Sequence, residues 1–498
     1  MNQHHRAGYL IAALIVLVPM LLIQPFSWPV QGDRAFLIYM AQVVARGEPL
    51  YAATPFGYTP LSALIGGGWI WLTSTVTDLP GYLSLRVLGL ICYPLTGMAI
   101  YHLLRGITQR SVLVWVGVLL FAGFGMPMMI GCINAEPKIL VVLFASLGMA
   151  AVLKERWLQA GLCAGLCVLA WHPAGLYGLA MLMTVMAGGG AQRWKAASRL
   201  VIGGLLALSV LVLYLSVTGT WQPAWNQLVL KHLANEASRL AEAPLRWVPE
   251  ISRGFLTEVP HFILAAAGVV IAIVRPGKTM LARPGSGMLF GGAIVLWLLF
   301  YSMEFQSHVD FIVILPLITV WAVVALERVM DLVSLPAWLW IVGVGIYGLG
   351  DVPFMRPRMT LDEQRAWIQE LADRYPDRPF VASRAEQVHV LLERQMPLKF
   401  IRYHNMEEVV VELEGGCARM GQQLADLSEF ILIVRRTEPR HYHACAAGHF
   451  SALCGGEPVA VYREPASMLP IPRLNTWYAQ YHVYECGKVG DRRLDVRD

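Results

Sequence analysis

The ionisable side chains that could do chemistry stand at the ends of apolar segments. Asp33 is the first acid of the chain and follows the first apolar run, while Glu136 and Lys138 stand between two later runs. A carboxylate such as Asp33 or Glu136 can deprotonate or orient an attacking hydroxyl group, and Lys138 can meet a phosphate as a compact cation. The alternative interpretation is helix capping, because Asp is a preferred N-cap residue and an acid before Pro137 suits a helix start.

Further candidates lie in the turns between apolar segments. His172 precedes a proline, and it can bind phosphate or relay a proton, or simply be a polar residue of a tight turn. Tyr58 stands just before Pro60 and a glycine-rich apolar stretch, where the simplest interpretation is a helix start. A last group can line the same cavity or extend toward the membrane surface, and it consists of Glu304, His308 and Asp310.

Several classes of function are not expected from this sequence. It contains no P-loop, no zinc-like spacing of His and Cys, and no G-x-S-x-G elbow. The net charge of +5 does not indicate nucleic-acid binding, because the basic residues stand in small groups between hydrophobic runs. No cofactor is required by the sequence, and dependence on a divalent metal stays open.

The elements that must position these residues are hydrophobic helices. The chain of 498 residues is 56% hydrophobic and 15% charged, whereas soluble domains carry roughly 25% charged residues. Of its 34 acidic residues, 20 follow Met355. This division predicts an all-α polytopic membrane bundle over residues 1–355 and a small C-terminal α/β domain over residues 356–498.

Eleven apolar runs predict membrane spans, for which ~20 residues are needed. They cover about residues 8–24, 81–104, 111–129, 137–153, 157–171, 174–188, 199–217, 260–274, 287–303, 309–326 and 335–351. The first is interpreted as a retained helix, since no small-residue cleavage site follows it. Basic residues gather in alternate connections only if residues 60–76 lie at the membrane interface. The N-terminus is then cytoplasmic, and loops 25–80 and 218–259 and the C-terminal domain are extracytoplasmic.

The C-terminal domain carries its own local signals. Thr360 and Glu363 form a capping-box pattern that opens a helix through about Tyr375. Runs typical of β-strands follow at residues 380–382, 398–401, 430–434 and 459–462, with a helical pattern between the first two. Disulfides become possible in an oxidising compartment, but the sequence does not determine the pairing of Cys417, Cys445, Cys454 and Cys486.

A series of phrases then follows in order along the first 350 residues. After Asp33, Phe36 and Met40 recur with Val43 at helical spacing, which predicts an amphipathic helix at the membrane interface. The later phrases are Ala41 through Gly47-Glu48-Pro49-Leu50-Tyr51, Tyr58-Thr59-Pro60-Leu61, the helix start with Arg86, a glycine-rich short helix ending at His172-Pro173, and His308 through Pro316. This order resembles the GT-C superfamily of membrane glycosyltransferases, and within it the protein mannosyltransferase and aminoarabinose transferase-like branch.

The resemblance implies a function and a site. It implies transfer of a sugar from a polyprenyl-phosphate donor, with inversion, to a glycolipid, polysaccharide or protein acceptor at the outer face of the membrane, and the character of the chain suggests a bacterial inner membrane. Asp33 falls where such enzymes keep the carboxylate of the first loop, and Glu136 falls where they often keep a second acid. The binding of the donor and its phosphate would fall to Arg34, Tyr58, Arg86, Lys138, His172 and His308.

Two other classes of function compete with this interpretation. A lipid or sugar transporter would place its ionisable residues midway through the helices and often show inverted repeats, whereas these candidates gather at one edge. A non-catalytic envelope assembly protein would not need an acid at position 33. The sequence leaves the sugar, the acceptor, the length of the donor glycan and the oligomeric state open.

Overall fold

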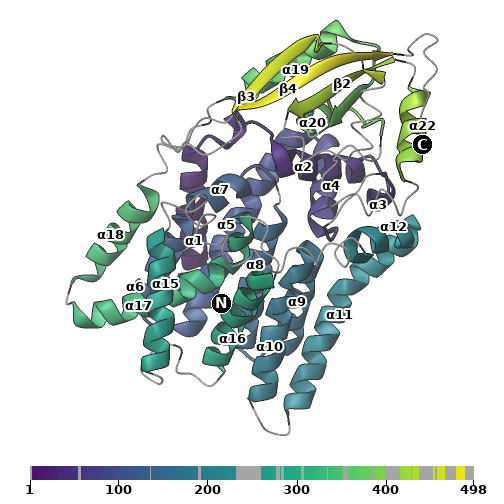
Figure 1. The fold of residues 1–498 in the computed structure, drawn as a ribbon. Coiled ribbons are helices and arrows are strands. Elements are labelled where there is room, and N and C mark those ends of the chain that lie inside the picture. The colour runs from purple at the N-terminus through teal and green to yellow at the C-terminus, as the bar shows by residue number, and fades with distance from the viewer. Residues whose placement is uncertain are drawn as a thin grey trace.

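The computed structural model describes most of the chain. The described residues are 3–53, 58–134, 136–188, 192–230, 259–275, 281, 285–303, 308–333, 335–350, 357, 359–383, 385–398, 416–427, 429–436, 453–454, 457–465 and 478–487. Within these ranges the protein is a bundle of apolar helices with a small α/β unit seated on one end (Figure 1).

The bundle is formed by helices that coincide with the predicted apolar runs. They are α1 (Gln3–Leu22), α5 (Gly81–Ile107), α6 (Ser111–Ala122), α7 (Gly125–Gly131), α8 (Pro137–Val152), α9 (Trp157–Ala170), α10 (Gly175–Ala187), α11 (Arg193–Thr218), α15 (Val259–Val274), α16 (Ser286–Met303), α17 (Leu315–Leu332) and α18 (Ala337–Leu349). Short elements connect them: η1 (Pro25–Ser27), α2 (Gly32–Ala45), α3 (Leu50–Ala53), α4 (Leu61–Ser74), η2 (His172–Ala174), α12 (Trp221–Trp225), η3 (Asn226–Leu230) and η5 (His308–Ile314).

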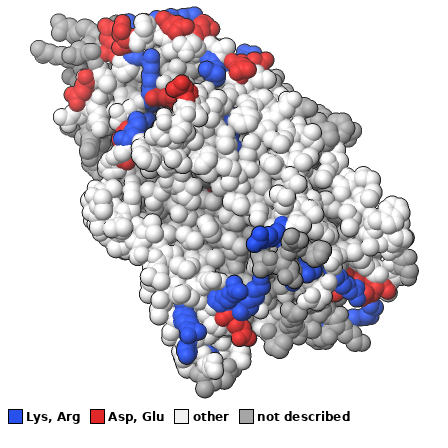
Figure 2. Space-filling view, turned by 180° about the vertical axis from the view of Figure 1, so that it is seen from behind, with Lys and Arg blue, Asp and Glu red and all other residues white. Residues whose placement is uncertain are grey.

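The surface of the bundle is that of a membrane protein. Among the described residues, three helical segments are long and apolar enough to cross a bilayer: Gly81–Ile107, Arg193–Thr218 and Val309–Leu332. Figure 2 shows a broad face almost without Lys, Arg, Asp or Glu, with charged side chains at its two ends. Such a face suits the hydrocarbon of a bilayer, where ionisable groups are costly. The total of eleven spans stays a prediction.

The predicted run 111–129 is wrong as a single helix. The structure ends α6 at Ala122 and begins α7 at Gly125. At the break, a Cβ on Gly123 would lie 2.6 Å from the Cα of Gly348 in α18, so two backbones meet where only glycines fit. Hydropathy alone does not reveal this interruption, because both halves are apolar.

Helices α9 and α11 pack through small residues. A Cβ added to Gly161 would lie 1.9 Å from the Leu200 carbonyl oxygen, and one added to Gly203 would lie 2.2 Å from the Leu158 carbonyl oxygen. Gly165, one turn after Gly161, approaches α11 in the same way. Glycines at such spacing let two membrane helices approach until their backbones touch, which increases van der Waals contact where no hydrophobic effect separates helix from lipid.

The C-terminal unit is an α/β layer. Its sheet has the order β1-β2-β4-β3, in which β1 (Phe380–Ser383) pairs parallel with β2 (Glu429–Arg436). The strands β3 (Ala460–Pro465) and β4 (Tyr478–Gly487) complete it with antiparallel pairings. The described helices of this unit are α19 (Leu361–Arg374), α20 (Gln387–Leu392) and α22 (Gly416–Asp426).

Most local predictions for this unit are confirmed. The capping box of α19 forms, with the Thr360 hydroxyl accepting from the Glu363 amide and the Glu363 carboxylate accepting in return. Three predicted strands appear as β1, β2 and β3. The run 398–401 lies outside the described residues apart from Leu398, which is not in a strand. Strand β4 was not predicted, although it lies in the centre of the sheet.

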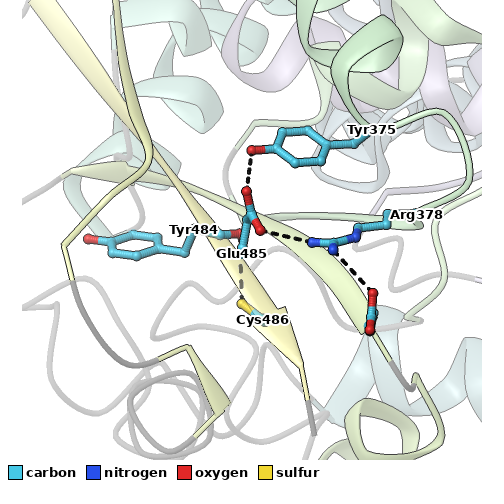
Figure 3. Close-up of polar contacts among 6 residues, drawn as sticks. Tyr375, Arg378, Tyr484, Glu485 and Cys486 are labelled. Carbon is cyan, nitrogen blue, oxygen red and sulfur yellow. Dashed lines mark hydrogen bonds and ion pairs between the residues drawn. The ribbon is translucent and has the colours of Figure 1, made fainter. Parts of the chain in front are cut away.

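A disulfide and an ionic cluster tie the far end of the sheet together. Cys454 is bonded to Cys486 of β4, while Cys445 lies outside the described residues. In Figure 3, Glu485 accepts a hydrogen bond of 2.6 Å from the Tyr375 hydroxyl and pairs with Arg378 at 3.1 Å. The hydrogen bond from Tyr375, and after it the contact with Arg378, holds the pKa of the Glu485 carboxyl below its ordinary value. The cluster joins the end of α19 to the sheet.

Helix α2 forms where an amphipathic helix was predicted, but it does not lie open at an interface. Residues 35–43 are all buried, on every side of the helix. One side packs against α4, and the other against α20 of the C-terminal unit. The domain contacts are specific, because the Gln42 amide donates to the Val390 carbonyl and the Met396 amide donates to the Tyr39 hydroxyl oxygen. The helix is therefore a layer between bundle and domain (Figure 1).

Candidate functional site

The predicted carboxylate Asp33 lies in the first turn of α2, exposed to solvent. The N-cap position belongs to Gln31, whose side chain makes no capping hydrogen bond. Gly32 between them has φ +55°, a conformation that L side chains adopt only with strain. The chain therefore turns sharply at Gly32, and Asp33 lies in the first turn of the helix rather than at its N-cap position.

Arg86 supports the segment that leads to this turn. Its side chain is completely buried in α5, and its guanidinium donates to the carbonyl oxygens of Pro25, at 2.5 Å, and of Trp28. Charge-assisted hydrogen bonds of this kind are stronger than neutral ones. In this structure Arg86 holds the loop before Asp33, and its contact with a donor phosphate stays a prediction.

Glu136 is the second predicted acid. It occupies the N-cap position of α8 but makes no capping hydrogen bond with its side chain, and the residue is only 6% exposed. Burial raises the pKa of this carboxyl, with Lys138 and Arg34 acting against the shift and the charge of Asp33 adding to it. A buried carboxylate that does not cap its helix is costly, and an acid with a raised pKa is typical of functional sites.

The structure brings the two predicted acids into one electrostatic group. The Arg34 guanidinium interacts with both the Glu136 and the Asp33 carboxylates. The three side chains come from two connections that are about a hundred residues apart in the chain, the α2 turn and the start of α8. A pair of acids around one cation can position a hydroxyl nucleophile and accept its proton.

Lys138 is held in a buried ion pair beside this group. Its ammonium lies 2.7 Å from the Asp310 carboxylate, and the two side chains are 10% and 4% exposed. The ammonium also lies 5.3 Å from the centre of the Trp171 ring, within cation–π range. The backbone carbonyl of Asp310 also accepts a hydrogen bond of 2.7 Å from the Tyr301 hydroxyl. Asp310, one member of the predicted cluster at residues 304–310, is thus the ion-pair partner of Lys138.

The remaining predicted binding residues are placed less closely. Tyr58 lies within electrostatic reach of Lys138, and its carbonyl accepts from the Tyr51 hydroxyl at 3.0 Å. His172 begins η2 next to Trp171, which is stacked on Trp297. The side chain of His308 and all of Glu304 lie outside the described residues. The roles predicted for these residues therefore stay predictions.

No metal centre is apparent in the part of the chain that the structure describes. Within those ranges, no three His, Cys, Asp or Glu side chains are close enough together to hold a metal ion. Asp33 and Glu136 are two carboxylates of the kind that hard divalent cations prefer. A metal chelator in a transfer assay tests whether the activity depends on such a cation.

Comparison with known proteins gives a fold. No family model matches the sequence, and no curated protein matches it either. Among solved structures, ArnT from Cupriavidus metallidurans aligns over 96% of this chain and 97% of its own, with a TM-score of 0.59 and 11% identity. Its structure bound to undecaprenyl phosphate aligns over 97% of this chain and 98% of its own, with a TM-score of 0.61 and 12% identity. The chain has the GT-C fold.

The structure of a second protein supports the same fold. The oligosaccharyltransferase of Archaeoglobus fulgidus, tethered with an acceptor peptide, aligns over 87% of this chain and 69% of its own, with a TM-score of 0.55 and 13% identity. At such low identity the fold is shared although most side chains differ. The predicted fold is therefore confirmed, and the chemistry must be argued from the residues of this chain.

Sequence reasoning missed the residues that connect the GT-C bundle to its C-terminal domain. Gln364, Glu464 and Glu393 contact the bundle from more than 300 residues away in the chain. The sequence gives no direct signal for them, since Glu464 follows the predicted strand at residues 459–462 by two positions. No local pattern indicates which distant segment such a carboxylate will meet.

Proposed function

We propose that this protein is a membrane glycosyltransferase that transfers a sugar from a polyprenyl-phosphate donor to an acceptor at the end of the bundle that carries the C-terminal domain. The observation that carries the proposal is the grouping of an exposed acid, Asp33, with a buried acid, Glu136, around Arg34. The GT-C fold is shared with ArnT, one structure of which binds undecaprenyl phosphate. That ligand supports a lipid-phosphate donor for this chain.

The proposed step is a displacement at the anomeric carbon of the donor sugar. Asp33 takes the proton of the acceptor hydroxyl as its oxygen attacks, the bond from the anomeric carbon to the phosphate oxygen breaks, and polyprenyl phosphate leaves with the bonding electrons. Attack opposite the leaving group inverts the anomeric centre. Arg34 stabilises the charge of the leaving phosphate, as fixed cations do in transition states. The charge of Lys138 is already balanced by Asp310. We therefore expect Lys138 to orient the donor phosphate rather than to supply net positive charge.

The orientation in the membrane follows as part of the proposal. A disulfide between Cys454 and Cys486 suits an oxidising compartment, which supports an extracytoplasmic C-terminal domain and a cytoplasmic N-terminus. The donor would then be used at the outer face of a bacterial inner membrane. A lipid tail in the bilayer and a sugar at its surface explain why the candidate acids lie at one end of the bundle.

The test is a transfer assay with matched variants. Purified protein in detergent is given radiolabelled polyprenyl-phosphate sugars and a membrane-lipid extract, with and without a metal chelator. We expect Asp33→Asn and Glu136→Gln to lose about 10²–10⁴-fold in turnover, the usual worth of a general base. Asp78→Asn is the control, because Asp78 is an exposed acid in the connection between α4 and α5.

Each outcome decides something. Loss in the first two variants with full activity in Asp78→Asn supports the proposal. Equal activity of wild type and Asp33→Asn would remove Asp33 from the chemistry. Absence of transfer by wild type with every donor, together with uptake of lipid-linked sugar into sealed vesicles, would favour a transporter instead.

A further inference from the structure

The C-terminal domain contacts the chain just ahead of Asp33. Gln364 of α19 bonds to both backbone groups of Val30: the Val30 amide donates to its Oε1 at 2.8 Å, and its Nε2 donates to the Val30 carbonyl at 2.9 Å. One side chain therefore satisfies both backbone polar groups of a residue that lies three positions before the candidate base. Gln364 is completely buried, so both of its groups depend on these partners.

A buried carboxylate orients Gln364. Glu464 of β3 is completely buried, and it accepts hydrogen bonds from the Gln364 amide at 3.0 Å and the Trp367 indole at 3.1 Å. It also accepts from Gln31, the N-cap residue of α2, at 3.3 Å. The carboxylate thus fixes the amide that holds Val30 and touches the residue that begins the helix of Asp33.

Keeping this carboxylate buried costs free energy. Burial raises the pKa of Glu464, while its hydrogen bonds to Gln364, Trp367 and Gln31 act in the opposite direction. A pair of apolar side chains would join the domain to the bundle without that cost. The arrangement is directional, since it fixes the position of one short segment rather than merely burying area.

The bundle also holds the same segment. Arg86 bonds to the carbonyls of Pro25 and Trp28, and Gln364 bonds to Val30. The segment from η1 to the α2 turn is therefore held between two buried polar side chains, one from the membrane bundle and one from the domain. Other domain contacts lie farther along, such as the 3.0 Å bond from Gln395 to Glu48 at the opposite end of α2.

We propose that Gln364 and Glu464 are positioning residues that set the direction of Asp33, so that the C-terminal domain is part of the catalytic unit. This inference rests on the proposed function of Asp33. Geometry of this kind matters because a misplacement of about 1 Å can reduce a rate by about 10²-fold. The domain then acts on turnover through the Val30 segment, and donor binding depends on other groups.

The experiment compares Gln364→Ala and Glu464→Ala with Gln395→Ala. All three remove a polar contact from the domain to the first loop, but Gln395 contacts the far end of α2. We expect a fall of about 10–100-fold in kcat for the first two variants, with the KM for the donor changed by less than about threefold. Glu464→Gln should recover most of the activity, because Gln31 can turn its amide oxygen toward the new amide group.

A second readout does not depend on activity. Hydrogen exchange of the Val30 amide, which donates to Gln364, should become faster in Gln364→Ala and Glu464→Ala but not in Gln395→Ala. If the alanine variant does not fold, Gln364→Met keeps the bulk of the side chain and removes both hydrogen bonds. Wild-type-like thermal unfolding identifies the variants that are compared.

The outcomes separate this inference from the proposed function. If exchange of the Val30 amide is unchanged in the variants, the contact from Gln364 does not constrain this segment. If exchange becomes faster but kcat is unchanged, the contact constrains the segment without affecting catalysis. Faster exchange with reduced kcat and constant KM supports it. If the wild type transfers no sugar, the proposed function fails and the positioning of a base fails with it, while the exchange result still reports whether the domain holds the loop.

Discussion

Substitution of either member of the buried ion pair between Lys138 and Asp310 should strongly destabilise the bundle. Its N–O distance is 2.7 Å, with side chains 10% and 4% exposed. A matched comparison exists in the same protein, since Arg110 and Asp331 form an ion pair at 2.8 Å with side chains 52% and 38% exposed. The two pairs share their separation and differ in burial.

Burial decides the expected magnitudes. Lys138→Met keeps the length of the side chain but leaves the Asp310 carboxylate buried without its cation, which costs about 3–5 kcal/mol. Arg110→Met breaks a pair that water screens, which costs about 0–1 kcal/mol. In the double variant Lys138→Met, Asp310→Leu no charge is left behind, so its stability should lie within about 1–2 kcal/mol of wild type.

The assay is unfolding of the purified variants by a denaturing detergent, followed by tryptophan fluorescence. A double-mutant cycle gives the coupling between the two sites, which we expect to be about 3 kcal/mol or more, with both single variants less stable than the double. The reasoning is refuted if Lys138→Met is as mild as Arg110→Met, or if the two single effects simply add. Transfer by the stable double variant then reports whether Lys138 also contacts the donor.

Three further predictions follow from packing, covalent structure and protonation. Gly161→Leu should disrupt the contact of α9 with α11 and lower the thermal stability, because its Cβ meets the Leu200 carbonyl, whereas Gly291→Ala has open space and should leave the melting temperature nearly unchanged. Replacing Cys454 and Cys486 by serine should cost the domain about 2–4 kcal/mol, measured by unfolding with and without reductant; no difference from wild type would contradict a formed disulfide. His389 is buried, and burial lowers its pKa to about 3. The folded state therefore binds fewer protons than the unfolded state between that pH and about 6.5, so the free energy of unfolding should fall as the pH drops through this window. Unfolding measured against pH should show a flatter profile for His389→Leu.

Much of the candidate site could be predicted because it depends on local rules. An acid that follows or precedes an apolar run is expected at an end of the bundle, and this predicts that Asp33 and Glu136 lie at helix ends, where the structure has them. The capping box of Thr360 and Glu363 depends on residues three apart, so sequence determines it completely. The broken helix at Gly123 was missed because its cause is the approach of α18, which no local pattern describes.

The identity of each partner could not be predicted in the same way. Lys138 was expected to meet a phosphate, yet its ammonium is paired with an acid 172 residues away. Helix α2 was expected at the membrane surface because its spacing is amphipathic, yet the domain covers its other side. In both cases a second segment, distant in the chain, supplies the surroundings that decide what the side chain does.

The sequence by itself determined where the apolar helices run, where the charged ends lie and which acids stand at those ends, because hydrophobic length and helix capping act within a few turns of the chain. Tertiary structure alone decided that Glu136 acts electrostatically on Arg34 from 102 residues along the chain, and that Gln364 holds Val30 across 334 residues. Such pairs depend on how the helices and the sheet pack in three dimensions. Their free energy comes from burial that exists only after the distant segments have met.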